Sequence, residues 1–235
     1  MLGKLLFIIQ ALLVFYYFSS VLQWQSYKIK RVLFNFSKPR WHFIFFATPI
    51  IVIAATDIFD KPIWEALFLF VYAFYFTKWL KGIDKKLVFT ARIKRLWAIF
   101  AILIIAQTAL LPQVMQALYL LISTAAAYFI SIEIEKKIAL SFENKSLQKL
   151  SEISPIVVAI TASFGKTSIK NFAAHILSKK YRLYATPASV NTKIGIIKDI
   201  NEHLPQDAEI YIVEAGARQK GDIAEIVSLV RPKYA

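Results

Sequence analysis

The stretch Thr161-Ala162-Ser163-Phe164-Gly165-Lys166-Thr167-Ser168 decides how the second half of this chain folds. The apolar, β-branched run at 156–160 precedes it and predicts a buried strand of a parallel sheet. After it, apolar residues recur at helical spacing, at Ile169, Phe172, Ala173, Ile176 and Leu177. A strand, a loop of small residues, Gly-Lys-Thr and a helix follow one another as they do around a phosphate-binding loop.

The residue types of this loop suit the phosphates of a nucleotide. Backbone N–H groups of the loop and of the helix N-terminus would face the anion. Gly165 lets the backbone approach closely, Lys166 would contact the β- and γ-phosphates, and Thr167 would offer a hydroxyl to Mg²⁺. The usual first glycine of such loops is replaced by Ile160, so a plain strand–helix turn stays an alternative for this segment alone.

Two later segments also lead from a strand to a helix. Thr186–Gly195 follows a short strand and enters a helix that begins near Ile194. The apolar strand 209–213 ends at Glu214, and another helix begins at 221–223. An acid at the carboxyl end of a strand beside a P-loop strand is placed to contact magnesium, although a solvated strand end is the alternative for Glu214 by itself.

Together the three segments resemble the Mur ligase family. Its central ATPase domain carries T-G-[ST]-x-G-K-T, T-P-G-N-x-N-x-x-I-G and E-x-G-A-x-x-x-G-[ED]-I motifs, which stand here as Thr161–Thr167, Thr186–Gly195 and Glu214–Ile223. Residues 167–170 and 227–232 are most similar to the member that joins D-alanyl-D-alanine to a UDP-N-acetylmuramoyl-tripeptide. The resemblance covers about residues 150–235 and implies a partial P-loop parallel sheet of the Mur ligase central domain, with a further strand beginning near Tyr234.

The resemblance implies an ATP-dependent amide ligase of peptidoglycan precursor synthesis, with ATP and Mg²⁺ as cofactors and UDP-muramoyl-peptide and D-Ala-D-Ala as substrates. ATP would phosphorylate a terminal carboxylate, and the incoming amine would displace phosphate from the acyl phosphate. The implied catalytic residue is Lys166. The implied nucleotide-binding residues are Ser163, Phe164, Gly165, Lys166, Thr167, Ser168 and Asn191. The implied metal ligands are Thr167, Thr186 and Glu214.

The sequence departs from the family pattern at two glycine positions. Ala162 and Ala188 replace them, and alanine would cost about 1 kcal/mol wherever a positive φ is required. The family's later His, its carbamylated Lys and its amino-acid-binding domain would lie beyond Ala235. We therefore expect the 235 residues to be an incomplete ligase, inactive alone, and the identity of the added amino acid or dipeptide stays open.

The composition divides the chain into two unlike parts. It is 57% hydrophobic, carries a net charge of +14 and has no cysteine, which excludes a disordered chain and a disulfide-stapled module. Residues 1–132 hold 14 basic and 4 acidic residues, whereas residues 133–235 hold 15 and 11. Because the excess positive charge belongs to the apolar part, a membrane protein with basic loops is favoured and no nucleic-acid partner is expected.

Residues 1–132 are predicted to form an α-helical membrane region of about five transmembrane helices. Residues 133–150 are predicted as a connector, and 151–235 as the partial α/β ATP-binding domain. Glu65 is the only acid inside a predicted span and is expected at the membrane interface, so the region has an anchoring role. The apolar runs are Leu5–Trp24, Trp41–Thr56, Ile63–Thr77, Leu96–Leu111 and Val114–Ile132.

The basic residues of the loops predict the orientation. Residues 28–40 and 78–95 are rich in lysine and arginine, whereas the loop between the second and third spans holds only Lys61 beside Asp57 and Asp60. We therefore expect a multi-pass protein of the bacterial inner membrane, in contact with lipid, with its N-terminus outside and its second half in the cytoplasm.

Two other functions fit parts of the sequence. A P-loop membrane transporter or sensor predicts polar residues deep in the spans and a Walker-B strand ending in Asp, where this chain has Tyr211-Ile212-Val213-Glu214. A non-catalytic membrane protein with a degenerate nucleotide-binding fold is favoured by Ala162 and Ala188. Binding of ATP distinguishes the ligase from this last alternative.

Overall fold

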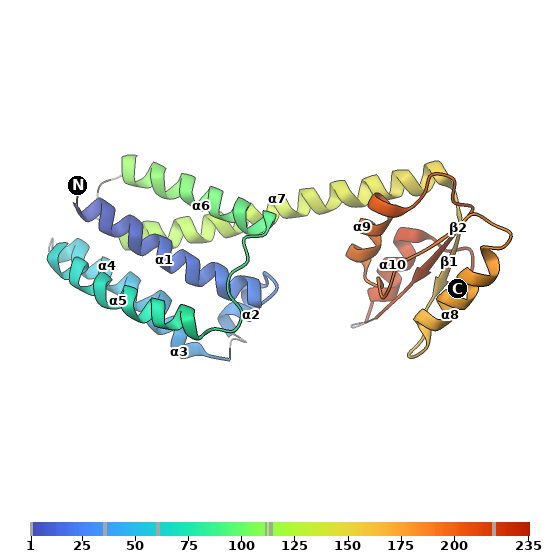
Figure 1. Cartoon of the computed structure of the whole chain (residues 1–235). Helices are drawn as coiled ribbons and strands as arrows, with labels where there is room; N and C mark the ends of the chain where they lie inside the picture. Colours follow the sequence, from blue (N-terminus) through green and yellow to red (C-terminus); the bar gives the residue numbers. More distant parts are fainter. Residues whose placement is uncertain (1, 35–36, 60–61, 111, 113–114, 218–219) are drawn as a thin grey trace. The chain divides into compact units, whose positions relative to one another are not determined.

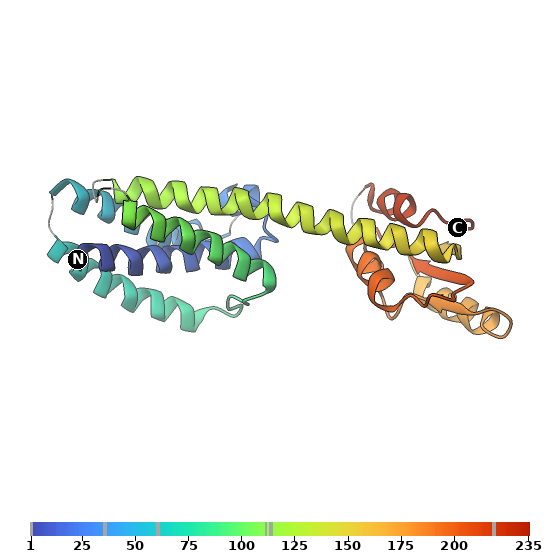
Figure 2. The same ribbon diagram turned by 90° about the horizontal axis from the view of Figure 1, so that it is seen from above.

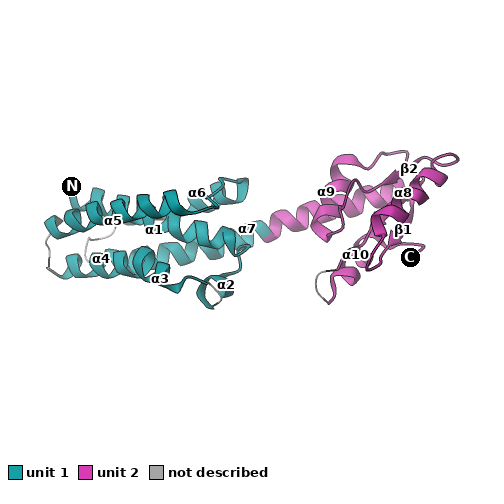
Figure 3. Ribbon diagram, turned by 60° about the horizontal axis from the view of Figure 1, so that its bottom comes forward, with its two compact units in different colours: residues 1–135 teal, residues 136–235 magenta. Residues whose placement is uncertain are grey.

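The computed structural model describes residues 2–34, 37–59, 62–110, 112, 115–217 and 220–235. It divides into two compact units, residues 1–135 and 136–235, shown in different colours in Figure 3. The predicted span ends Leu111 and Val114, and Arg218 of the third motif, lie outside the described residues.

The first unit is helical. It contains α1 (Leu2–Trp24), α2 (Ile29–Phe34), α3 (Pro39–His42), the π-helical turn η1 (Phe43–Ala47), α4 (Thr48–Phe59), α5 (Pro62–Gly82), α6 (Ala91–Leu110) and the start of α7 (Gln116–Ile153). In the part of the chain that the structure describes, five helical stretches are long and apolar enough to cross a membrane. They are Leu2–Trp24, Pro39–Ile58, Ile63–Gly82, Ala91–Leu110 and Gln116–Ile153.

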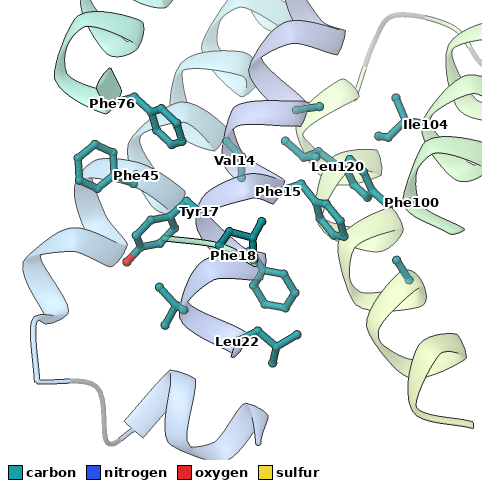
Figure 4. Packing of buried hydrophobic residues seen from close by; sticks show 14 of the residues in the cluster. Val14, Phe15, Tyr17, Phe18, Leu22, Phe45, Phe76, Phe100, Ile104 and Leu120 are labelled. Atoms are coloured by element: carbon teal, nitrogen blue, oxygen red, sulfur yellow. The ribbon is translucent and has the colours of Figure 1, made fainter. Parts of the chain in front are cut away.

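Helix α1 lies at the centre of the first unit, between α4 and α5 on one side and α6 and α7 on the other (Figures 1 and 2). Its apolar stretch is 67% buried, compared with 17–39% for the other four. Phe15 stacks on Phe100 of α6 with ring centroids 3.6 Å apart, and Tyr17 packs against Phe45 (Figure 4). The outer helices leave many apolar side chains exposed, including Ile58, Phe70, Ile102 and Leu110.

Glu65 is buried among the helices of the first unit, and its expected position at the membrane interface stays a prediction. It lies in the first turn of α5, which packs against α1 and α4, and the residue is only 4% exposed. Atom Oε1 has no hydrogen-bond partner among the described residues. Neighbouring helices of the first unit therefore cover the Glu65 side chain, although it lies close to the start of α5.

The second unit has the predicted order of strands and helices. It contains β1 (Ile156–Ile160), α8 (Lys166–Leu177), β2 (Leu183–Ala185), α9 (Lys193–His203), β3 (Ile210–Glu214) and α10 (Asp222–Val230). The strands are parallel in the order β1-β3-β2, which confirms the predicted parallel sheet. Tyr234 forms a parallel bridge to Val158, as expected for a further strand that begins there.

The strand order places helices on both faces of the sheet. The chain crosses from β1 to β2 through α8, then returns to the central position of β3 through α9. Right-handed crossovers in opposite directions put α8 and α9 on opposite faces. On the α9 face, Val157, Tyr211 and Val213 join a core with α9 and α10, against which Leu150 and Ile153 of α7 pack.

Helix α8 turns a different face to the sheet than its apolar pattern suggested. Ile169, Phe172 and Ile176 remain exposed, although the sequence assigned them to one apolar face. The buried residue of α8 is instead Lys170. Its ammonium reaches Glu214 at the end of β3, so a lysine, and not the apolar stripe of α8, lies at this edge of the sheet.

A buried carboxylate ties α9 to two strands. Asp199 Oδ1 accepts a hydrogen bond from the hydroxyl of Tyr184 (2.8 Å), and Oδ2 accepts one from Tyr211 (3.5 Å). His203 Nδ1 lies 3.5 Å from Oδ1 on the exposed side. Burial raises the pKa of Asp199, while the hydrogen bond from Tyr184 and the charge of His203 oppose this rise.

The raised pKa of Asp199 predicts that the second unit loses stability as the pH rises. The unfolded carboxyl ionises near its ordinary pKa of 3.8 and the folded one at higher pH, so the free energy of unfolding falls between the two values. Asp199→Asn should remove this decline in urea denaturation followed by circular dichroism. The control Asp207→Asn changes an exposed carboxyl and should show the same decline in stability with pH as the wild type. An unchanged decline in Asp199→Asn would contradict the assignment of this pH dependence to Asp199.

Candidate functional site

The predicted phosphate-binding loop joins β1 to α8. Gly165 caps the helix with φ +77°, a left-handed conformation that glycine adopts without a steric penalty. Ser163, Phe164 and Ser168 are exposed beside it. Lys166, the first residue of α8, donates from Nζ to the carbonyl of Ala162 at 2.7 Å. The loop therefore presents backbone N–H groups and one ammonium at the carboxyl end of β1.

Glu214 is the polar centre of the site. The register pairs it with Ile160, the last residue of β1, so the loop and the carboxylate lie at the same edge of the sheet. Thr167 donates from its hydroxyl to Glu214 Oε2 at 2.9 Å, and Asn191 donates from Nδ2 to Oε1 at 3.5 Å. The structure thus brings together one predicted residue from each of the three motifs.

Lys170 completes this cluster, and the sequence did not predict it as a site residue. Its ammonium lies 3.4 Å from Glu214 Oε2, and both side chains are only 2% exposed. Lys170 Nζ also donates to the carbonyl of Ala188. The available signal was the i, i+4 spacing from Lys166, which places both lysines on one side of α8.

Thr186 and Asn191 occupy the second motif in different ways. Thr186 is buried, and its hydroxyl accepts a hydrogen bond from the backbone N–H of Glu214 at 3.4 Å. Gly216 N–H donates to the carbonyl of Asn191 at 3.0 Å. A Cβ at Gly216 would lie 2.8 Å from Asn191 Cγ, so this close approach requires glycine. The predicted role of Thr186 as a metal ligand stays a prediction.

A cavity of about 730 Å³ opens beside these residues within the second unit. Its walls come from the start of α8, the start of α9, the segment after β3, the start of α10, and α7. Both basic and acidic groups face it. The lining residues are Ala139, Glu143, Lys166, Asn191, Thr192, Lys193, Ile194, Ile197, Gly216, Ala217, Asp222, Glu225 and Ile226.

The donor set beside the loop fits magnesium and a nucleotide phosphate. Mg²⁺ prefers oxygen ligands, and commonly takes one or two from the protein and the others from phosphates and water. Glu214 and Thr167 offer a carboxylate and a hydroxyl whose oxygens already lie 2.9 Å apart. Among the described residues, no group of three His, Cys, Asp or Glu side chains is placed to hold a metal ion.

Ala188 has the positive φ that its replacement of glycine made critical. The φ of Ala188 is +43°. The φ of Ala162 is not positive. Ala188→Gly should therefore raise the free energy of unfolding by about 0.5–1 kcal/mol, since relief of strain exceeds the added entropy of the unfolded chain. Ala162→Gly should lower it by about 0.5–1 kcal/mol, because only the entropic cost applies.

The pair of alanine variants is compared by urea denaturation. Effects of opposite sign are expected because one alanine is strained and the other is not. A loss of stability in Ala188→Gly would show that its left-handed backbone carries no strain.

Comparison with known proteins finds a family match for this part of the chain. Residues 160–235 match the family model described as the Mur ligase middle domain, which confirms the resemblance seen in the three motifs. The matched segment runs from the end of β1 to the end of the chain and contains Lys166, Lys170, Asn191 and Glu214.

Curated proteins also match part of the chain. The UDP-N-acetylmuramoyl-tripeptide–D-alanyl-D-alanine ligase of Escherichia coli is 34% identical over 102 residues, which is 43% of this chain and 22% of that protein. The enzyme of the same name from Treponema pallidum is 32% identical over 80 residues (34% and 17%), and that from Bacillus subtilis is 31% identical over 86 residues (37% and 19%). The chain thus spans about a fifth of the length of these relatives.

Proposed function

Starting from the match of residues 160–235 to the Mur ligase middle domain, we propose that the second unit binds Mg²⁺ and ATP as part of a peptide ligase of peptidoglycan precursor synthesis. The contact between Thr167 of the loop helix and Glu214 of β3 carries this proposal. It joins the phosphate loop to a carboxylate at the place where a nucleotide-bound magnesium is held in P-loop proteins.

Each site residue has a role in this function. Lys166 exchanges its bond to the Ala162 carbonyl for a phosphate oxygen, which is a stronger, charge-assisted contact. Gly165 and the loop N–H groups would face the phosphoryl group of a bound nucleotide and stabilise its charge. Thr167 and Glu214 would hold Mg²⁺, which neutralises phosphate charge when bound. Asn191 holds the second motif against Glu214.

The substrates follow from the relatives' names and are part of the proposal. The relatives are named as ligases of a UDP-N-acetylmuramoyl-tripeptide and D-alanyl-D-alanine. In such a reaction the tripeptide carboxylate would take the γ-phosphate of ATP and release ADP, and the dipeptide amine would then displace phosphate from the acyl phosphate to form the amide. The cavity beside Lys166 and Asn191 is large enough to admit part of such a ligand next to the phosphates.

Nucleotide binding is the direct test. The purified chain in detergent should bind ATP measurably in isothermal titration calorimetry with Mg²⁺, and more weakly with EDTA, since Glu214 would then face phosphate oxygens without a bridging cation. No ATP binding under either condition would contradict the proposal and favour a non-catalytic protein with a degenerate nucleotide fold.

The first unit is proposed to anchor this domain in the bacterial inner membrane. Five apolar helical stretches and the exposed apolar side chains of the outer helices support this location. The absence of cysteine from the chain allows single cysteines to report sidedness. In intact spheroplasts, a membrane-impermeant maleimide should label Gln113→Cys and not Lys86→Cys; the reverse pattern would overturn the proposed orientation.

A further inference from the structure

Helix α7 contributes directly to the cavity beside the phosphate loop. Ala139 and Glu143 both line it, and their i, i+4 spacing places them on one face of the helix. The opposite face of α7, around Ser141, Asn144 and Lys145, is exposed. The cavity wall therefore comes from a helix that precedes the region matched to the Mur ligase middle domain.

An ion pair links α7 to the residues around Glu214. Glu143 Oε1 lies 2.8 Å from Lys193 Nζ, with each side chain little more than a quarter exposed. Lys193 is the first residue of α9 and directly follows Thr192, whose hydroxyl caps the helix by accepting from Gly195 N–H. Asn191 directly precedes Thr192 and donates a hydrogen bond to Glu214. Three consecutive residues thus connect Glu143 with the proposed metal ligand.

Further contacts fix α7 along the rest of α9. Asn201 donates from Nδ2 to the carbonyl of Phe142 at 2.9 Å, and Lys149 Nζ lies 3.5 Å from the carbonyl of Asn201. The last turns of α7 add Leu150 and Ile153 to the core shared with α9. Contacts between α7 and α9 therefore flank Glu143, which pairs with Lys193 at the α9 N-terminus beside the cavity.

We propose that α7 forms part of the ligand site, with Glu143 as a positioning residue that acts through Lys193 on the Asn191–Thr192 segment. This inference rests on the proposed nucleotide site. Because α7 contacts both the cavity and α9, ligand binding and the packing of α7 are coupled, and each stabilises the other. Helix α7 runs from Gln116 to Ile153 and also includes the fifth apolar stretch.

Single cysteines test the position of α7. Ala139→Cys and the control Ser141→Cys are labelled with an environment-sensitive fluorophore in the full chain and titrated with Mg²⁺ and ATP. A saturable fluorescence change, or loss of ATP binding through steric block, is expected at position 139 and not at position 141. Equal behaviour of the two labelled proteins would overturn the inference.

Glu143→Gln tests the positioning role. It should weaken ATP binding about fivefold, the lower end of common coupling effects. Glu202→Gln is the matched control, since Glu202 pairs with Lys198 on the solvent-facing side of α9 and should leave binding unchanged. Thermal melts of both variants establish that each is folded.

The outcomes separate this inference from the proposed function. If the wild-type chain binds ATP and Glu143→Gln binds equally well, α7 has no positioning role while the nucleotide site stands. If the wild-type chain binds no ATP, the proposed function fails and the inference fails with it. Weakened binding in Glu143→Gln with unchanged binding in Glu202→Gln supports both.

Discussion

Lys170→Met lowers the free energy of unfolding of the second unit by about 3–5 kcal/mol. Lys170 and Glu214 are each only 2% exposed and lie 3.4 Å apart, so loss of the ammonium leaves a buried carboxylate without its counter-charge. The hydrogen bonds from Thr167 and Asn191 remain, but neither carries a positive charge. Pulse proteolysis at increasing urea concentrations measures the change in this unit.

A double variant distinguishes the loss of charge balance from a simple packing defect. Lys170→Met combined with Glu214→Gln removes both charges and should recover much of the lost stability, because no uncompensated charge is left buried. Lys179→Met, on an exposed lysine just beyond α8, should leave stability unchanged. A double variant less stable than Lys170→Met would contradict the proposed charge pairing.

Lys166→Ala weakens binding of Mg²⁺ and ATP at least about thirtyfold, which corresponds to roughly 2 kcal/mol for a hydrogen bond to a charged group. Its ammonium lies at the cavity, and its one bond to a described residue goes to a neutral carbonyl in its own loop, so it is available to a phosphate. Removing it should leave the fold intact, since no buried charge depends on it. Calorimetric titration measures the affinity.

The matched control for this prediction is Lys179→Ala, which removes an exposed lysine near the other end of α8. This control changes the net charge by the same amount as Lys166→Ala and leaves the phosphate loop unchanged. Equal binding by the wild type and Lys166→Ala would exclude the phosphate role of Lys166. An equal loss in both variants would instead indicate non-specific electrostatic attraction.

The two lysines of α8 have separate functions in this description. Lys166 is available to a ligand, whereas Lys170 is committed to Glu214 and to the carbonyl of Ala188. Loss of Lys166 should therefore affect binding far more than stability, and loss of Lys170 should affect both. This contrast follows from burial, because two lysines one helical turn apart differ in what surrounds them.

The sequence by itself determined the order of strands and helices, the phosphate loop and the acid at the end of β3. Each of these is a local pattern: a β-branched run predicts β1, Gly-Lys-Thr marks the start of α8, and Glu214 directly follows an apolar strand. The five apolar stretches were equally evident, because the length and hydropathy of a helix are properties of consecutive residues.

Only the tertiary structure decided which side chains meet. The pairing of β1 with β3 sets Ile160 opposite Glu214 and so brings Thr167 to the carboxylate across 47 positions of sequence. In the folded unit Lys170 is also buried, and part of the apolar pattern of α8 stays exposed. Hydrophobic periodicity shows which face of a helix is apolar, but the neighbouring elements decide which face is covered. The cavity wall formed by Glu143 of α7 depends on the same long-range packing, which no local pattern encodes.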